Sequence, residues 1–214
     1  MIAIVDAGLG NLRSVEKAIA HAGGSARVTD DPEVVAAAER VVVPGQGAFG
    51  DCGRALARDA PLGRAILDAI AQKKPYLGIC LGLQILFEES EEAPGCRGLG
   101  VLPGRVSRIP DGLRDTATGA RLKVPHMGWN PVAPRIPHPL LPRDATPFYF
   151  VHSYHALPED PACLAATVEY GGLAITAAVA RESLFAVQFH PEKSQRDGLT
   201  LLEAFVRWTP GVAR

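Results

Sequence analysis

The sequence has no excess of charge and no long apolar run, and each of these absences excludes a class of partner. Its 214 residues carry 22 basic and 23 acidic side chains, for a formal net charge of -1. Neither sign forms a long run, so no nucleic acid is expected as a partner. No apolar stretch approaches the ~18 residues of a transmembrane helix. We therefore expect no association with a membrane.

Cysteine is scarce and scattered. The four cysteines lie far apart and lack the spacing of metal ligands or of a disulfide framework: Cys52, Cys80, Cys96 and Cys163. The six histidines are equally dispersed, so we predict neither a metal site nor a cofactor. No basic-then-apolar leader opens the chain, and we expect a cytoplasmic protein. This length suits one domain spanning residues 1–214, with a core large enough to be stable without disulfides.

The first part of the chain alternates short β-branched runs with helical patterns. Strands are predicted at residues 2–5, 26–29, 41–43 and 75–79. Apolar residues at helical spacing predict helices over residues 12–22, 83–88 and 51–71, the last interrupted at Pro61. Such alternation is typical of an α/β protein with a parallel sheet covered by helices.

Beyond residue 95, glycine and proline punctuate shorter extended segments. Strands of an antiparallel extension of the sheet are predicted at residues 101–105, 148–151, 164–168, 175–179 and 184–189. Six prolines between residues 131 and 147 predict a surface loop. A closing amphipathic helix is predicted from apolar side chains at residues 199, 202 and 206.

One cysteine lies where a strand turns into a helix. Residues 78–82 read Gly-Ile-Cys-Leu-Gly, between the apolar run 75–79 and the helical pattern 83–88. Glycines two positions before and after Cys80 suit a strained turn that lifts the side chain clear of its backbone. A helix N-terminus at this point favours the thiolate, which is the nucleophilic form of cysteine. An inert core cysteine fits the same five residues equally well.

A histidine and a glutamate further along the chain supply the partners that a thiol nucleophile needs. The apolar run 185–189 ends in His190, Pro191 and Glu192, and a strand should stop at Pro191. Residues two apart in an extended segment face the same way, so Glu192 can bind the imidazole nitrogen that faces away from the thiol. Open parallel sheets place their sites beyond the carboxyl ends of strands, where Cys80 also falls. Alone, the tripeptide is more typical of a surface turn.

A glycine-rich turn follows the strand predicted at residues 41–43. It reads Pro-Gly-Gln-Gly at residues 44–47. Two glycines free the backbone to point N–H groups at a developing oxyanion, and the N–H of Leu81 supplies a second donor. A plain loop has the same composition.

In this order and spacing, the three segments resemble the class I (triad) glutamine amidotransferases. Residues 5–12, 123–130 and 149–154 are similar to the glutaminase subunits of imidazole glycerol phosphate synthase, in histidine biosynthesis. The run Pro-His-Met-Gly-Trp-Asn within 123–130 selects this subfamily. Ala7 and Gln46 depart from a family that often has tyrosine and valine there, but neither change removes a reacting group. The resemblance covers essentially the whole chain and implies a flavodoxin-like three-layer fold, with helices on both faces of a mostly parallel sheet.

The resemblance also implies a reaction and a partner. Cys80 attacks the carboxamide carbon of glutamine, His190 passes a proton to the departing ammonia, and Glu192 orients His190. A glutamyl thioester forms, and water then releases glutamate. The ammonia passes to a cyclase subunit, a (β/α)8 barrel, which completes the imidazole ring and releases aminoimidazole carboxamide ribonucleotide. The heterodimer is thus a lyase that uses the hydrolase activity of this chain.

Further site residues follow from the same resemblance. The oxyanion is assigned to Gly45, Gln46, Gly47 and Leu81. The substrate L-glutamine is assigned to Gln84, Ser153 and Tyr154. The face toward the cyclase is assigned to Asn11, His126, Met127, Trp129, Asn130 and Lys193.

Two other functions stay open on the sequence alone. One is a different triad amidotransferase, such as the glutaminase subunit of aminobenzoate or anthranilate synthesis, which residues 125–130 disfavour. The other is a non-catalytic scaffold, disfavoured because all three triad residues are present. Several of the residues assigned to glutamine and to the cyclase also have a structural alternative. His126 and Trp129 fit a packed turn, Gln84 an exposed polar side chain, Tyr154 a half-buried aromatic ring and Lys193 a solvated charge.

Overall fold

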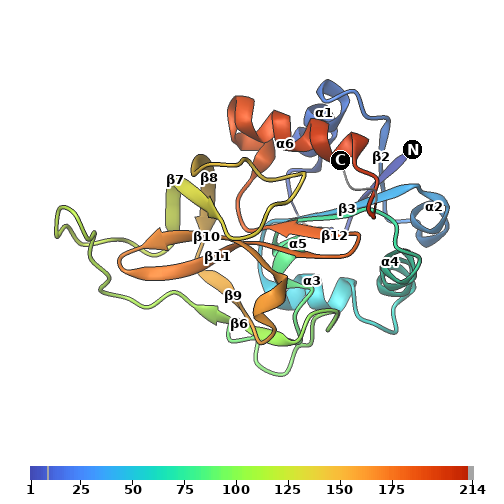
Figure 1. Ribbon diagram of the computed structural model, residues 1–214. Helices are drawn as coiled ribbons and strands as arrows, with labels where there is room; N and C mark the ends of the chain where they lie inside the picture. Colours follow the sequence, from blue (N-terminus) through green and yellow to red (C-terminus); the bar gives the residue numbers. More distant parts are fainter. Residues whose placement is uncertain (9, 212–214) are drawn as a thin grey trace.

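A large central sheet with helices on both faces forms the body of the protein (Figure 1). The computed structural model describes residues 1–8 and 10–211. Leu9, which belongs to one of the segments that carry the family resemblance (residues 5–12), lies outside the described residues.

Five strands form the parallel part of the sheet. They lie side by side in the order β2 (Ala26–Thr29), β1 (Ile2–Val5), β3 (Arg40–Gly45), β4 (Tyr76–Cys80) and β12 (Leu184–Val187), and each neighbouring pair is parallel. β1, β4 and β12 are buried along their whole length, as continuous apolar runs between two helical layers must be. Because the carboxyl ends of parallel strands share one edge, the segments after β3, β4 and β12 emerge together.

The sheet continues from β12 as an antiparallel extension, as predicted. Its strands are β11 (Leu173–Arg181), β10 (Leu164–Tyr170), β7 (His126–Pro134) and β8 (Thr146–His152). The prediction of a loop over residues 131–147 is wrong at both ends, because Pro131 pairs with Pro147 across β7 and β8. Prolines facing each other fit a non-hydrogen-bonded pair, which needs no N–H from either residue. The loop itself spans residues 135–145.

In the described part of the chain, six helices form the two outer layers. One face of the sheet is covered by α1 (Leu12–His21) and α6 (Gln195–Arg207), and the other by α2 (Pro32–Ala37), α3 (Phe49–Ala55), α4 (Pro61–Ala71) and α5 (Leu81–Gln84). The interruption predicted at Pro61 is confirmed, since Pro61 opens α4 at a position where its missing N–H costs nothing. None of the described helices is long and apolar enough to span a membrane.

The helix predicted over residues 83–88 is wrong in its position and length. α5 begins at Leu81 and ends at Gln84. The backbone carbonyls of residues 85–88 instead accept hydrogen bonds from the N–H groups of residues 98–102. A helix cannot continue through carbonyls that are bound by another segment.

A second, three-stranded sheet lies beside α5. It consists of β5 (Glu89–Ser90), β6 (Gly104–Arg108) and β9 (Tyr154–Pro158). The strand predicted at residues 101–105 therefore begins later than expected and belongs to this small sheet. Two 3-10 turns, η1 (Pro161–Cys163) and η2 (Pro191–Lys193), complete the secondary structure of residues 1–8 and 10–211.

Candidate active site

Cys80 stands on a sharp elbow between β4 and α5. Its φ of 55° and ψ of -106° are unusual for a residue with a side chain, and such strain costs about 1–3 kcal/mol. A Cβ on Gly82 would lie 1.7 Å from Val43 O, and one on Gly78 would lie 2.4 Å from Gly82 O. The buried Tyr76 hydroxyl donates a hydrogen bond to Gly82 O at 3.0 Å. The elbow therefore requires glycine on both sides of the cysteine.

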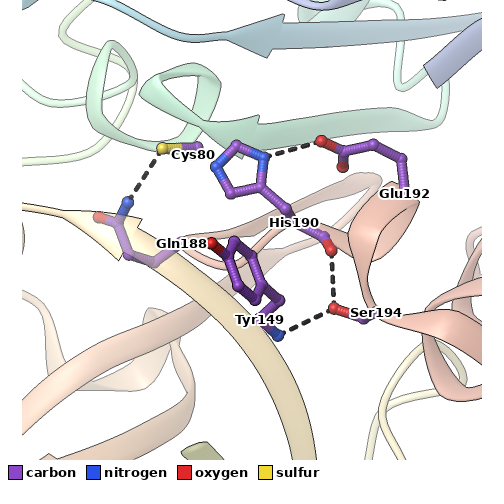
Figure 2. A network of polar contacts seen from close by, with 6 residues as sticks. All are labelled: Cys80, Tyr149, Gln188, His190, Glu192 and Ser194. Carbon is purple, nitrogen blue, oxygen red and sulfur yellow. Dashed lines mark hydrogen bonds and ion pairs between the residues drawn. The ribbon is translucent and has the colours of Figure 1, made fainter. Parts of the chain in front are cut away.

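The environment of the Cys80 sulfur comes mainly from side chains. α5 has only four residues, so its peptide dipoles add up to less than the half charge of a full helix, and the predicted helix effect is weaker than expected. Instead, Gln188 Nε2 donates a hydrogen bond to Cys80 Sγ at 3.5 Å (Figure 2). Gln188 follows β12 and is fully buried.

His190 and Glu192 form a buried pair next to the sulfur. His190 Nδ1 and Glu192 Oε1 lie 2.8 Å apart, and each side chain is 1% exposed. Figure 2 shows the imidazole ring between the carboxylate and Cys80. Among the described residues, His190 Nε2 has no hydrogen-bond partner. The extended geometry predicted for residues 190–192 is wrong, because the 3-10 turn η2 folds Glu192 back onto the ring.

The electrostatics of this pair favour a protonated ring. Burial lowers the pKa of His190, but the nearby sulfur of Cys80 and the hydrogen-bonded carboxylate of Glu192 outweigh burial and raise it to about 9. The imidazole therefore holds a proton at neutral pH. A cationic ring beside a sulfur is an environment that activates thiol nucleophiles.

A buried serine ties the His190 segment to β8. Ser194 Oγ donates to His190 O at 2.7 Å and accepts from the backbone N–H of Tyr149 at 3.0 Å (Figure 2). The His190 N–H donates to Tyr149 O at 2.9 Å. No role was predicted for Ser194, although it closes the segment that carries His190 and Glu192.

A pocket of about 420 Å³ opens over Cys80 and His190, within the usual range for small-molecule sites. It collects most residues predicted for the oxyanion and for glutamine: Gln46, Gly47, Leu81, Gln84, Ser153 and Tyr154. Gly45 does not line it. A Cβ on Gly45 would lie 2.6 Å from Leu81 Cβ, so this glycine permits close packing of β3 on α5. Gly47 has a φ of 116°, which only glycine adopts easily.

Glu92 also lines the pocket, and the sequence did not indicate it. Its Oε2 accepts a hydrogen bond from the N–H of Phe49 at 2.8 Å, so it holds the start of α3 just after the glycine turn. Glu92 lies in the turn that follows β5 and belongs to no recognisable motif. A carboxylate in this pocket suits the ammonium group of an amino acid.

The six residues predicted to face a partner do not share one surface. Side chains alternate along β7, so Met127 and Trp129 are 61% and 47% exposed, whereas His126 is 2% exposed. The side chain of His126 is therefore buried behind the predicted face, and Asn130 is half-buried on the same side. Trp129 and Lys193 both lie over Tyr149, with 6.1 Å between the two ring centroids and 6.0 Å from Nζ to the Tyr149 centroid. Asn11 is exposed where α1 begins.

The other cysteines and the metal-binding side chains do not add a second centre. All four cysteines are free thiols. Among residues 1–8 and 10–211, no three His, Cys, Asp or Glu side chains form a group that could hold a metal ion.

The comparisons with known proteins agree with this geometry. The family model for glutamine amidotransferase class-I matches residues 3–208. The imidazole glycerol phosphate synthase subunit HisH of Aromatoleum aromaticum is 55% identical over 214 residues, which cover 98% of this chain and 99% of the relative. The same subunit of Dechloromonas aromatica is 54% identical over 213 residues, covering 98% and 97%.

A solved structure shows the same fold at low sequence identity. The structure of PurLQS from Thermotoga maritima aligns with a TM-score of 0.71 at 19% identity, over 95% of this chain and 96% of that chain. Its likeness concerns the fold alone. With a family model that spans nearly the whole sequence and relatives above 50% identity, the chain belongs to the class I glutamine amidotransferase family.

Proposed function

We propose that this chain is the glutaminase subunit of an imidazole glycerol phosphate synthase, and that it hydrolyses L-glutamine to glutamate and ammonia. The observation that carries the proposal is the arrangement at the elbow. Cys80 projects from a strained turn beside His190, whose other ring nitrogen is 2.8 Å from Glu192. The relatives above 50% identity support the choice of synthase.

The geometry leads to a two-step mechanism. The Cys80 sulfur attacks the carboxamide carbon, and backbone N–H groups of Gly47 and Leu81 are assigned to the resulting oxyanion. His190 gives its proton to the departing nitrogen, so ammonia leaves and a glutamyl thioester remains on Cys80. His190 then takes a proton from water as the water attacks the thioester. This step releases glutamate and restores the thiol.

Polar groups around the pocket suit the two charged ends of free glutamine. Gln84 uses both Nε2 hydrogens internally, toward Tyr154 O at 2.9 Å and Gln188 Oε1 at 3.0 Å. Its Oε1 is the remaining polar atom, which we assign together with Glu92 to the substrate ammonium. Ser153 and Tyr154 are assigned to the substrate carboxylate. An amino acid is thereby favoured over a simple amide.

The surface around Tyr149 is the proposed contact with the cyclase barrel. Met127 and Trp129 are large exposed apolar side chains on one face of β7, and Lys193 adds a charge beside them. Asn11 completes the proposed contact at the start of α1. Ammonia would pass from Cys80 into the barrel without release to solvent. The cytoplasm is the proposed compartment, because a nucleophilic thiol must stay reduced.

Two assays test the proposal and its alternatives. Glutamine hydrolysis is measured with and without the cyclase and its nucleotide ligand, and imidazole glycerol phosphate is measured as the product. Cys80→Ala should abolish glutamine-dependent turnover while free ammonium still supports the cyclase. Loss of both activities in this variant would contradict the division of labour.

The competing functions give different results. Activity with an aminobenzoate or anthranilate synthase partner in place of the cyclase would favour the other amidotransferase. Failure of a glutamine-analogue electrophile to label Cys80 would favour a non-catalytic scaffold.

A further inference from the structure

A continuous chain of hydrogen bonds runs from β7 to the nucleophile. Asn130 Nδ2 is 3.3 Å from His126 Nε2, and His126 Nδ1 is 3.0 Å from His152 Nε2. His152 Nδ1 is 2.9 Å from Tyr154 O. Gln84 also donates to Tyr154 O and in turn to Gln188, which donates to Cys80 Sγ. We call these groups the Asn130–Cys80 chain.

The donors and acceptors in the first half of this chain can have only one order. Tyr154 O is a carbonyl and can only accept, so His152 must carry its proton on Nδ1 and accept at Nε2. His126 must then donate from Nδ1 and accept at Nε2. Asn130 supplies that last proton from Nδ2, which also donates to Glu169 O at 2.9 Å. Each ring thus has one defined tautomer.

Burial keeps both rings neutral, as this order requires. Burial lowers the pKa of His126 to about 4. Burial, with a smaller contribution from His126, lowers the pKa of His152 to about 3. His126 also stacks on Phe150 and lies against the tilted ring of Tyr170, with ring centroids 4.7 and 4.2 Å away. The His126 ring is therefore fixed in place as well as in protonation.

The second half of the Asn130–Cys80 chain, formed by Gln84 and Gln188, ends in direct contact with the catalytic sulfur. Both hydrogens of Gln84 Nε2 are used, and the second orients Gln188 Oε1. With its oxygen held, the Gln188 amide must turn its NH2 toward Cys80, as Figure 2 shows. A shift of Tyr154 O would release Gln84 and then Gln188. The position of the donor on the sulfur thus depends on His126 and Asn130, neither of which lines the substrate pocket.

We propose that His126 and His152 are positioning residues of the glutaminase reaction, which hold the Gln84–Gln188 amide pair in place beneath Cys80. The inference rests on the proposed function, because it concerns the rate of the same reaction. It also connects the nucleophile to β7, whose opposite face carries the exposed Met127 and Trp129. A partner that moves β7 would therefore change the environment of the sulfur.

Two substitutions of His126 separate positioning from simple packing. The amide of His126→Asn falls near Nδ1 and keeps the donor to His152, whereas the amide of His126→Gln falls near Nε2 and keeps only the contact with Asn130. Glutamine is closer to histidine in volume, so a packing role predicts that His126→Gln is the milder change. Positioning predicts the reverse order.

The expected result is a selective effect on kcat. His126→Gln should lower kcat for glutamine about tenfold, the effect of one lost hydrogen bond, with a smaller rise in KM because Gln84 and Tyr154 are also assigned to the substrate. His126→Asn should stay within about threefold of wild type, because the bond that it loses is the outer one. Equal rates, or a slower His126→Asn, would overturn the inference.

Matched controls complete the experiment, which uses the whole protein in complex with the cyclase. His138 is another histidine whose pKa burial lowers to about 4, and it stacks on Phe185 outside the Asn130–Cys80 chain. His138→Asn and His138→Gln should leave kcat unchanged, and a kcat loss in His138→Gln equal to that of His126→Gln would overturn the inference. No hydrolysis by the wild-type complex would overturn the proposed function itself, and the positioning role with it.

A second variant keeps the test decisive if neither His126 variant folds. Asn130 is half-buried, and aspartate has nearly the same shape, but the carboxylate of Asn130→Asp can only accept a hydrogen bond. The carboxylate holds a proton on His126 Nε2, so at a pH high enough to keep the ring neutral His152 Nε2 is left without a donor. The expected loss in kcat is again about tenfold, with thermal unfolding as the check on folding. A folded Asn130→Asp complex with wild-type kcat would overturn the inference.

Discussion

Gly82→Ala tests whether the elbow geometry controls catalysis. A Cβ at this position would lie 1.7 Å from Val43 O, and real Cβ contacts are essentially never shorter than 3.0 Å. Relieving the clash therefore needs a movement of about 1.3 Å between α5 and β3. Cys80 is two residues away in the same turn, so it moves with Gly82. Because a misplacement of about 1 Å can cost 10²-fold in rate, kcat for glutamine should fall by at least about 10²-fold.

The same substitution should lower the stability of the fold. Overpacking of a tight site costs about 1–3 kcal/mol. For a chain of this size, each kcal/mol corresponds to about 2–4 °C in Tm. A decrease of about 2–12 °C is therefore expected for a loss of about 1–3 kcal/mol, and calorimetry measures it. The glutaminase assay is run well below the Tm of the variant, so that lost activity reports geometry and not unfolding.

Gly50→Ala is the control for the loss of a glycine. Gly50 is buried in α3, and its added Cβ would meet Ala93 Cβ at 3.2 Å and the flexible end of Arg54 at 3.4 Å. These contacts need shifts of only a few tenths of an ångström, and alanine is the better helix former. Its kcat should be unchanged. A Gly82→Ala protein with wild-type kcat would refute the claim that the elbow needs glycine after the nucleophile.

Three further predictions follow from the same site. Tyr76→Phe leaves Gly82 O buried without its donor and should cost about 1–3 kcal/mol in urea unfolding; an unchanged midpoint would contradict this role. Because the pKa of His190 is raised from 6.5 to about 9 in the folded protein, protonation of the ring stabilises the fold. This stabilisation is fully present below pH 6.5 and is lost as the pH rises through about 9. Since Glu192→Gln removes part of that shift, its loss of stability should be largest near pH 6 and should shrink above pH 9, and a loss that grows with pH would argue against the ion pair. Ser194→Ala frees the His190 segment from β8 and should lower kcat more than it raises KM in steady-state assays, whereas an unchanged kcat would exclude this tie.

The parallel part of the fold was predictable because its signals are local and strong. β1, β3 and β4 are continuous apolar runs, which only a sheet covered on both faces can bury. Glycines flanking Cys80 indicated the elbow because Gly82 lies too close to Val43, and Gly78 too close to Gly82, for either to carry a side chain. The position of His190 followed from the rule that sites form beyond the carboxyl ends of parallel strands.

The rest depends on contacts that a single segment does not encode. β7 holds glycine, asparagine and two prolines, a poor strand composition, and it becomes a strand because β10 and β8 pair with its two edges. The helix predicted at residues 83–88 stops early because a distant loop binds its carbonyls. Glu92 reaches the pocket from a turn with no motif of its own. The polar contact of Gln188 with Cys80 was hidden in a run that reads as an apolar strand.

The two faces of β7 explain how a surface contact and a buried site can depend on each other. Side chains alternate along the strand, so Met127 and Trp129 point outward where His126 and Asn130 point inward. The contact of His126 with His152 on β8 is already 3.0 Å long, and a separation of about 3.6 Å is no longer a hydrogen bond. A displacement of β7 away from β8 by more than about half an ångström would therefore break the Asn130–Cys80 chain. Since the outer side chains are fixed to the same backbone, a partner that binds them cannot move one face without the other.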